Sequence, residues 1–206
     1  MIFGKVYTCG CKWKCGYCFV PEIVKARNGM SGREAVEKIK ASRVMQAICV
    51  TGGEPTEQKD LPIFLRNLKL LGLKIMIETN GENPEMLKKI INRKLVDFVR
   101  LDVKGPFEKY EEITRSSGDG VIESLKALTG WNGYWEVVTV WHPQLDREDL
   151  AKMSKSIPGK WVIVPFEKGN CMDPKLNIDG EWDEEFLAGL KDNVWVRTKT
   201  YERRLS

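Results

Sequence analysis

Short runs of apolar, often β-branched residues alternate along the chain with longer segments in which apolar side chains recur every three or four positions. The short runs predict buried strands, and the longer segments predict amphipathic helices. Strands are predicted at residues 2–8, 47–53, 73–81, 96–105, 133–143 and 160–167. Helices are predicted at residues 31–42, 60–72, 83–94 and 146–157, with shorter helical pieces at 107–113 and 121–130. Regular alternation of strand and helix is typical of a parallel sheet with right-handed crossovers.

Several predicted helices carry residues that favour a helix end at that position. Ser31 is a plausible N-cap, Pro84 stands in the first turn of its helix, and Gly72 follows a helix as a good C-terminal stop. These signals agree with the helix boundaries that the apolar pattern suggests.

Six strand–helix alternations in 206 residues predict a partial, open (β/α)6 barrel, because a complete eight-unit barrel usually takes about 250 residues. The tail at 181–204 predicts a short helix–strand extension, with an antiparallel place at the sheet edge as one option. We expect a single domain with a core at about 2–170 and an extension at about 171–206.

Composition and charge narrow the class of protein. The chain is 42% hydrophobic and 30% charged, as in ordinary globular proteins. Its 33 basic and 29 acidic residues are spread along the chain, so no concentrated field for nucleic acid is expected. No stretch approaches the ~18 apolar residues of a membrane span, and the first residues do not resemble a signal peptide. We therefore expect a cytoplasmic protein that binds neither membrane nor nucleic acid.

Polar and glycine-rich clusters follow nearly every predicted strand. A cysteine-rich loop follows the first strand, and the later clusters read TGGEP, ETNG, DVKGP, WHP and PFEKGN. The carboxyl ends of parallel strands are where α/β sheets build active sites. This placement predicts an enzyme.

The cysteine-rich loop predicts a metal centre. Cys11, Cys15 and Cys18 are spaced C-x3-C-x2-C, whereas structural zinc sites use four closed ligands. Three thiolates on a four-iron cluster would leave one iron open to a substrate or cofactor. Cys9 could instead supply a fourth thiolate, which would give a closed zinc or iron–sulfur site, although we favour packing for it. His142 is the only histidine, and its role stays open.

The other two cysteines are less informative. Cys49 lies within an apolar run and is expected in the core. Cys171 lies in a loop after the last predicted core strand, where either a role near substrate or a plain loop position is open.

These motifs together resemble the radical S-adenosylmethionine (SAM) superfamily. The cysteine spacing with Tyr17 before the third cysteine resembles its cluster motif, and TGGEP resembles its segment that holds the methionine amino group of SAM. The resemblance extends through ETNG and DVKGP, over roughly residues 2–170. It is most similar to the activating enzymes of glycyl-radical enzymes, such as those of pyruvate formate-lyase and anaerobic ribonucleotide reductase.

The resemblance implies a [4Fe–4S] cluster on Cys11, Cys15 and Cys18, and SAM as the second cofactor. Reductive cleavage of SAM would give a 5′-deoxyadenosyl radical that abstracts hydrogen from the substrate. The residues implied in SAM binding are Tyr17, Gly52, Gly53, Glu54, Glu78, Asn80, Asp102 and Lys104.

Several of these residues could instead have a purely structural role. Asn80 with the next glycine could be only a turn, and Asp102 and Lys104, which share one face of a strand, could be a structural ion pair. At the sixth predicted strand, the activating enzymes often carry an aromatic residue and a histidine after proline. This chain has Glu167 instead. This departure puts adenosine contacts there in doubt and could mark a different substrate.

The implied partners are a glycyl-radical enzyme as protein substrate and a low-potential electron donor, flavodoxin or ferredoxin. A second enzyme hypothesis is a radical SAM enzyme that acts on a small molecule, as 7-carboxy-7-deazaguanine synthase does. A third hypothesis is a non-enzymatic zinc or electron-transfer protein.

Overall fold

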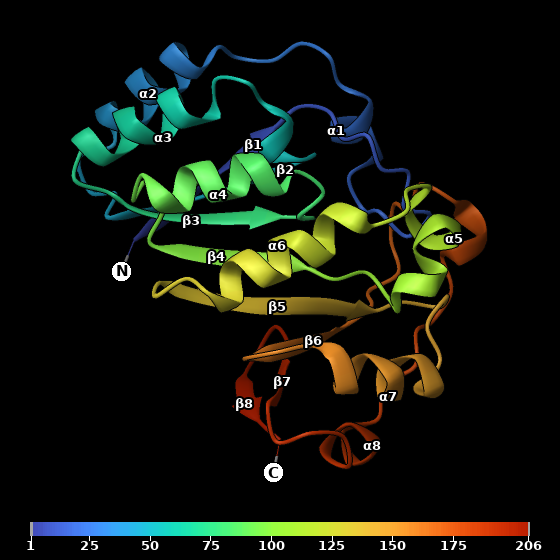
Figure 1. Ribbon diagram of the computed structural model, residues 1–206. Coiled ribbons are helices and arrows are strands. Elements are labelled where there is room, and N and C mark those ends of the chain that lie inside the picture. The colour runs from blue at the N-terminus through green and yellow to red at the C-terminus, as the bar shows by residue number, and fades with distance from the viewer. Residues whose placement is uncertain (1, 206) are drawn as a thin grey trace. The chain divides into compact units, whose positions relative to one another are not determined.

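The structure is a computed structural model that describes residues 2–205, and it has an α/β fold (Figure 1). The strands are β1 (Phe3–Thr8), β2 (Ala47–Gly52), β3 (Lys74–Thr79), β4 (Phe98–Asp102), β5 (Tyr134–Trp141), β6 (Trp161–Pro165), β7 (Val194–Arg197) and β8 (Glu202–Arg204). The α-helices are α1 (Pro21–Lys25), α2 (Gly32–Ala41), α3 (Leu61–Leu70), α4 (Pro84–Asn92), α5 (Tyr110–Thr114), α6 (Asp119–Thr129), α7 (Arg147–Ser156) and α8 (Glu184–Ala188). Short 3-10 helices are η1 (Pro55–Glu57), η2 (Phe107–Lys109) and η3 (Pro174–Leu176).

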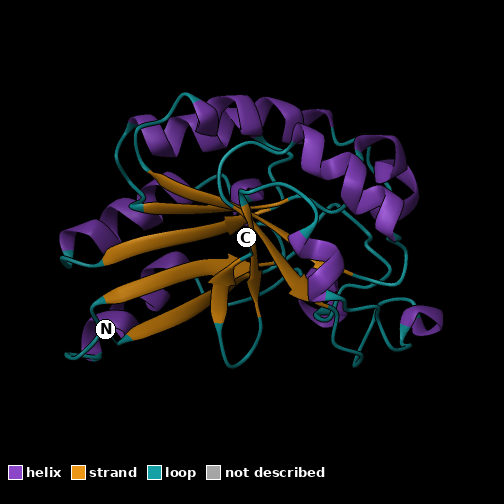
Figure 2. Ribbon diagram, turned by 90° about the horizontal axis from the view of Figure 1, so that it is seen from below, coloured by secondary structure: helices purple, strands orange, loops and turns teal. Residues whose placement is uncertain are grey.

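The chain packs as two compact units. The first contains the chain up to Lys12, Glu22–Arg100 and Gly120–Trp135. The second contains Trp13–Pro21, Leu101–Asp119 and the chain from Glu136 onward. In each unit the strands follow one another in chain order, and Figure 2 shows strands side by side with helices flanking them.

The register within each unit is regular. In the first unit β1 pairs in parallel with β2 and β2 with β3, so that Phe3 lies opposite Ala47 and Ala47 opposite Lys74. In the second unit β5, β6 and β7 pair in parallel, and β8 is antiparallel to β7. Parallel pairing brings the carboxyl ends of neighbouring strands to one edge of the sheet.

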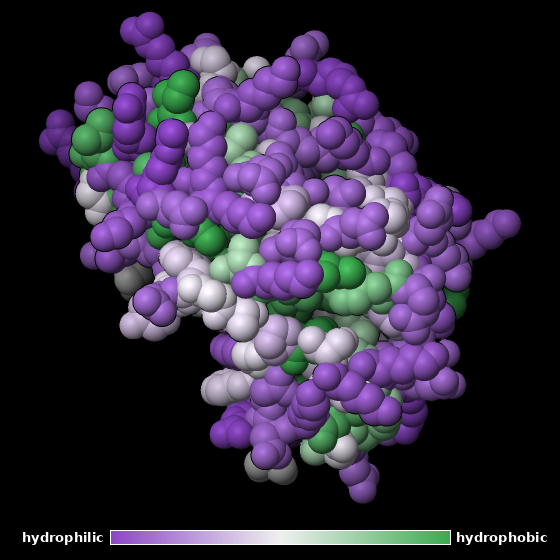
Figure 3. Space-filling view, in the orientation of Figure 1, coloured by the Kyte–Doolittle hydropathy of each residue, from purple (hydrophilic) through white to green (hydrophobic). Residues whose placement is uncertain are grey.

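The core of the first unit forms where alternate strand residues meet the helices. Side chains of β2, β3, α3 and α4 are fully or almost fully buried here, namely Ile48 and Val50, Ile75 and Ile77, Leu65 and Leu68, and Leu87 and Ile90. Since successive strand side chains point to opposite faces, the other face carries Cys49, Met76 and Glu78. The surface in Figure 3 is mostly hydrophilic, with smaller hydrophobic areas between.

Helix ends match their sequence signals. Ser31 and Glu34 form a reciprocal capping box at the start of α2. Asn83 caps α4 by accepting a hydrogen bond from the Met86 N–H. Gly72 follows α3 with φ of +77°, a backbone conformation that favours glycine.

The second unit combines an apolar core with a buried ionic cluster. Trp141 and Trp161 are fully buried, and the Trp161 indole N–H donates to the Thr139 hydroxyl at 2.9 Å. Glu136, only 1% exposed, pairs with Arg197 at 2.7 Å and with Lys160 at 3.2 Å. These ion pairs connect β5 to the start of β6 and to β7.

The predicted fold class is confirmed, with an open, predominantly parallel α/β sheet. The tail differs from expectation in having two strands, of which β7 is parallel and only β8 is the antiparallel edge strand. The single-domain boundaries stay a prediction. Among residues 2–205, no helix combines the length and apolar character that crossing a membrane requires.

Candidate functional site

In the first unit the loop after β2 packs directly on the start of the cysteine loop. The Gly53 N–H donates to the Thr8 carbonyl and the Glu54 N–H to the Gly10 carbonyl, both at 2.8 Å. A Cβ on Gly53 would lie 1.8 Å from the Gly10 carbonyl oxygen. Gly52 has φ of +117°, and a Cβ there would lie 2.3 Å from the Thr8 nitrogen. Both positions predicted for SAM binding therefore require glycine for close backbone approach.

Glu54 is 1% exposed and its carboxylate is surrounded by donors. It accepts hydrogen bonds from the Thr56 N–H at 2.9 Å, the Thr56 and Thr79 hydroxyls at 2.6 Å each, and the Asn80 N–H at 2.7 Å. Burial raises the pKa of Glu54, and these hydrogen bonds oppose the rise. The carboxylate thus ties the loop after β2 to the end of β3, and its predicted contact with SAM stays a prediction.

Asn80 lies beside the first cysteine of the motif. It is 6% exposed, and its side-chain amide donates to the Cys11 Sγ at 3.8 Å. Its Oδ1 accepts from the Glu82 N–H at 3.0 Å, which closes an Asx turn. Asn80 therefore forms the turn, and its amide is directed at the Cys11 sulfur, while its predicted contact with SAM stays a prediction.

Glu78 is held in an ion pair that the sequence did not predict. Its Oε1 lies 2.5 Å from Nη1 of Arg100, and both side chains are mostly buried. Burial opposes ionisation of Glu78, but Arg100, Thr51 and Lys5 together hold its pKa below the ordinary value. Glu78 is therefore a carboxylate at neutral pH that already has a cationic partner.

In the second unit the segment after β6 binds the cysteine loop through its backbone. The Met172 N–H donates to the Cys18 carbonyl at 3.0 Å and the Asp173 N–H to the Gly16 carbonyl at 2.8 Å. Cys15 is 8% exposed, and burial raises the pKa of its thiol to about 11 against the opposing effect of Lys104. A buried thiol of this kind is ionised readily only with a metal or cation beside it.

Tyr17 and His142 stack as a buried aromatic pair. Their ring centroids lie 3.8 Å apart with 13° between planes, and His142 is fully buried. The Gln144 N–H points at His142 Nδ1 at 3.3 Å, so Nε2 carries the proton and donates to the Lys104 carbonyl at 3.0 Å. Burial lowers the pKa of His142 to about 4. The ring is therefore neutral and fixed in one tautomer.

Asp102 and Lys104 form the predicted pair, with Nζ and Oδ2 separated by 2.9 Å. The Lys104 N–H donates to the Tyr110 hydroxyl at 3.1 Å. Burial opposes the Lys104 ammonium, but Asp102, Tyr17 and Cys15 together raise its pKa well above the ordinary value. Lys104 is a permanent cation near the Cys15 thiol.

Comparison with known proteins decides the family. Residues 6–157 match the radical SAM superfamily. The chain belongs to the radical SAM superfamily. It is 31% identical over 211 residues to a Methanocaldococcus jannaschii protein provisionally named a glycyl-radical enzyme activating enzyme, covering 94% of this chain and 88% of the relative. It is 27% identical over 194 residues to 7-carboxy-7-deazaguanine synthase of Thermococcus kodakarensis, covering 81% and 75%.

Solved structures agree on the fold of this radical SAM protein. The crystal structure of Streptococcus suis SuiB bound to SAM has a TM-score of 0.73 and 16% identity, and covers 96% of this chain. SuiB has also been solved bound to its precursor peptide SuiA, with the same TM-score. The chain spans about half the length of SuiB, 50% and 48% in the two structures.

The cofactors of this radical SAM protein are a [4Fe–4S] cluster and SAM. The donor set fits the cluster, because the motif offers cysteine sulfurs only and Asn80 supplies a hydrogen bond to one of them. In the part of the chain described, residues 2–205, no three His, Cys, Asp or Glu side chains form a ready-made metal site. The ligand assignment to Cys11, Cys15 and Cys18 therefore stays a prediction.

The predicted residues fall into two sets, one in each unit. The first unit holds Cys11, Gly52, Gly53, Glu54, Glu78 and Asn80. The second holds Cys15, Tyr17, Cys18, Asp102 and Lys104.

Several partners in these sets were not predicted from the sequence. Thr79 and Arg100 act through contacts between segments far apart in the chain, and Thr56 acts through a local contact with Glu54. For His142, the one sign beforehand was that it is the only histidine of the chain. Cys49 is buried as expected. The Cys9 thiol points to the Asn28 carbonyl at 3.7 Å, which suits the packing role that we favoured.

Proposed function

We propose that this radical SAM protein is an activating enzyme that abstracts a hydrogen atom from a glycine of a partner protein. The observation that supports this most directly is the similarity over nearly the whole chain to the provisionally named activating enzyme. The predicted site consists of backbone loops and a few buried side chains, which suits an enzyme whose substrate is a glycine of another protein.

In this proposal Cys11, Cys15 and Cys18 would hold the cluster through their thiolates. When bound and reduced, the cluster supplies the electron that cleaves SAM into methionine and a 5′-deoxyadenosyl radical. Lys104 offsets the negative charge that the thiolates gather in a buried environment. Asn80 fixes the orientation of Cys11 through its amide.

The same proposal gives SAM its protein contacts. The backbone at Gly52 and Gly53, held in place by its packing on Thr8 and Gly10, would contact the methionine part of SAM. The Asp102–Lys104 pair would contact SAM as a charged, pre-oriented unit. Tyr17, whose hydroxyl has no partner among the described residues, offers a buried ring and a polar group beside the second and third cysteines.

Glycyl-radical formation on a partner tests the function. The reconstituted protein is incubated anaerobically with SAM, dithionite and a glycyl-radical enzyme from the same organism, with the Cys15→Ala variant as control. We expect a glycyl-radical signal in electron paramagnetic resonance (EPR) spectra and an equal amount of 5′-deoxyadenosine, and neither with the control. Formation of 5′-deoxyadenosine without any protein radical would contradict the glycine assignment.

A second candidate is a small-molecule reaction like that of 7-carboxy-7-deazaguanine synthase. The relative from Thermococcus kodakarensis favours it, since the alignment covers most of both chains. Turnover of a pterin substrate in place of glycyl-radical formation would select this candidate. For either reaction we propose flavodoxin or ferredoxin as electron donor, tested by replacing dithionite with each reduced protein.

A further inference from the structure

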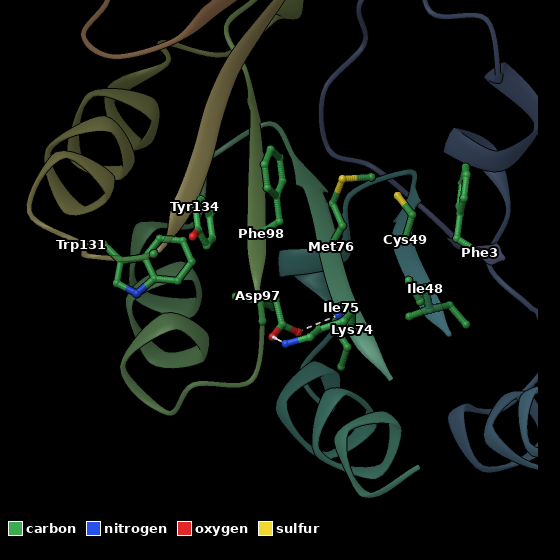
Figure 4. A pocket seen from close by; sticks show the side chains of 13 residues that line it. Phe3, Ile48, Cys49, Lys74, Ile75, Met76, Asp97, Phe98, Trp131 and Tyr134 are labelled. Carbon is green, nitrogen blue, oxygen red and sulfur yellow. Dashed lines mark hydrogen bonds and ion pairs between the residues drawn. The ribbon is translucent and has the colours of Figure 1, made fainter. Parts of the chain in front are cut away.

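The first unit contains an apolar cavity of about 620 Å³ at the beginning of its strands, which we name the base cavity. Figure 4 shows Phe98, Met76 and Cys49 side by side on neighbouring strands, with Phe3 at one end and Trp131 with Tyr134 at the other. Its remaining lining comes from Ala47, Ile48, Lys74, Ile75, Val96, Asp97 and Gly133. Phe3 is 60% exposed and Tyr134 is 78% exposed, so the cavity opens onto aromatic surface.

The base cavity lies at the opposite ends of the strands from the loops predicted to hold the cofactors. Glu78, one of the predicted SAM residues, borders it, because Glu78 lies two residues after Met76 on the same face of β3 and contacts Cys49 of the lining. Asn80, the first residue after β3, lies four residues beyond Met76, which is about 13 Å of extended chain. This distance from Asn80 and Cys11 makes the base cavity suit recognition better than chemistry.

The charged side chains in the lining are already paired. Asp97 accepts a hydrogen bond from the Ile75 N–H at 2.8 Å and forms ion pairs with Lys69 and with Lys74, the latter at 3.3 Å (Figure 4). Sites for polar small molecules usually keep a few free polar groups to orient the ligand. Because the Asp97 carboxylate already has hydrogen-bond and ion-pair partners, the lining favours a ligand with an aromatic or large aliphatic group. Contacts outside the cavity must then orient that ligand.

The loops at the amino ends of the strands, where the base cavity lies, are basic. The loops that lead into β2, β3 and β4 carry Arg43, Arg93 and Lys94, and Lys74 begins β3. The side chains of these four residues are exposed. Within residues 42–46, 71–74 and 93–97, Asp97 is the only acidic residue. Positive charge around an apolar opening attracts acidic chains and disfavours basic ones.

We propose that the base cavity docks an acidic segment of the partner protein, which inserts one aromatic or large aliphatic side chain between Phe3, Met76 and Tyr134. The proposal rests on the proposed function, because that function requires a protein partner. The apolar side chain anchors the segment, and Arg43 and Lys94 of the basic loops select its charge.

Methyl NMR on the cluster-loaded full chain tests the docking site. Methionine methyl groups are labelled with carbon-13, the Met76 signal is assigned from a Met76→Leu variant, and the probe is the peptide acetyl-Asp-Glu-Phe-Glu-Asp-amide. We expect the Met76 signal to shift on titration while that of Met153, a buried residue of α7, stays unchanged. Replacing Phe of the peptide by Ala, or its four acidic residues by Lys, should weaken binding about tenfold or more.

Surface variants give the matched control. Arg43→Glu combined with Lys94→Glu should weaken peptide binding about tenfold, whereas Lys155→Glu at the exposed end of α7 should leave it unchanged. No Met76 shift with the acidic peptide, or equal affinity for the basic one, would overturn the proposal. A Met76 shift that follows protein concentration without peptide would assign the cavity to a second copy of this chain and also overturn it. The titration involves no SAM cleavage, so it can fail while glycyl-radical formation succeeds, and the reverse.

Discussion

Replacing Gly53 by Ala tests the contact between the TGGEP loop and the cysteine loop. Real Cβ atoms essentially never come within 3.0 Å of a neighbour, but here the Cβ would lie 1.8 Å from the Gly10 carbonyl oxygen. The loops must therefore separate by the difference, at least 1.2 Å. The atom in the way belongs to the backbone, so no side-chain rotation can relieve the contact.

The magnitude follows from the hydrogen bonds that this separation breaks. Two backbone bonds of 2.8 Å, from Gly53 to Thr8 and from Glu54 to Gly10, would lengthen to about 4 Å, beyond hydrogen-bond range. Each broken bond costs about 1–3 kcal/mol, so we expect a loss of roughly 2–6 kcal/mol in the free energy of unfolding. Because the loop moves, we also expect the loss of SAM binding.

Gly72→Ala is the matched control for this prediction. Gly72 has φ of +77° but nothing within 4 Å of its Cβ position, so the change adds backbone strain without any contact. That strain costs about 1–2 kcal/mol and leaves SAM binding intact. Urea unfolding and equilibrium dialysis of SAM measure both effects. Equal losses in the two variants, with normal SAM binding by Gly53→Ala, would refute the reasoning.

Three further predictions concern the second unit. Arg197→Met should lower the free energy of unfolding by about 3 kcal/mol, because it removes a partner of buried Glu136. The double variant E136Q/R197M should recover part of this loss. Arg147→Met, which breaks an exposed ion pair, should cost about 1 kcal/mol or less in the same urea titration. His142 has a pKa of about 4 against an ordinary 6.5, so the stability it contributes is present above pH 6.5 and is lost as pH falls toward 4. His142→Phe, which keeps a ring beside Tyr17, should remove roughly 3 kcal/mol of this acid-induced loss, and an unchanged pH profile of unfolding would contradict the neutral histidine. Cys15→Ala should bind almost no iron and sulfide after anaerobic reconstitution, and full cluster loading would contradict the ligand assignment.

The sequence predicted the elements and the fold because local signals and periodicity agreed. The capping box at Ser31, the glycine stop at Gly72 and the apolar runs of β2 and β3 each act over a few residues. The tail was harder to predict because β7 and β8 are short, and β8 is exposed throughout, which gives a weak apolar pattern. Their opposite orientations depend on pairing with β6 and with each other.

The candidate site was predicted as a set of residues but not as a set of contacts. Glu54 was expected as a SAM contact, and the four donors from Thr56, Thr79 and Asn80 that surround its carboxylate were not foreseen. Arg100 reaches Glu78 only because β4 places it on the same face as Glu78 of β3. Pairings of this kind depend on strand register and on burial, which a residue pattern does not encode.

The central claim is that this chain uses a cluster on three cysteines to cleave SAM. The most direct measurement is anaerobic reconstitution with iron and sulfide, reduction with dithionite in the presence of SAM, and chromatography of the products. The account predicts methionine and 5′-deoxyadenosine in equal amounts, together with an EPR spectrum of the reduced cluster that changes when SAM is added. An intact cluster that yields no 5′-deoxyadenosine and whose spectrum SAM leaves unchanged would contradict it.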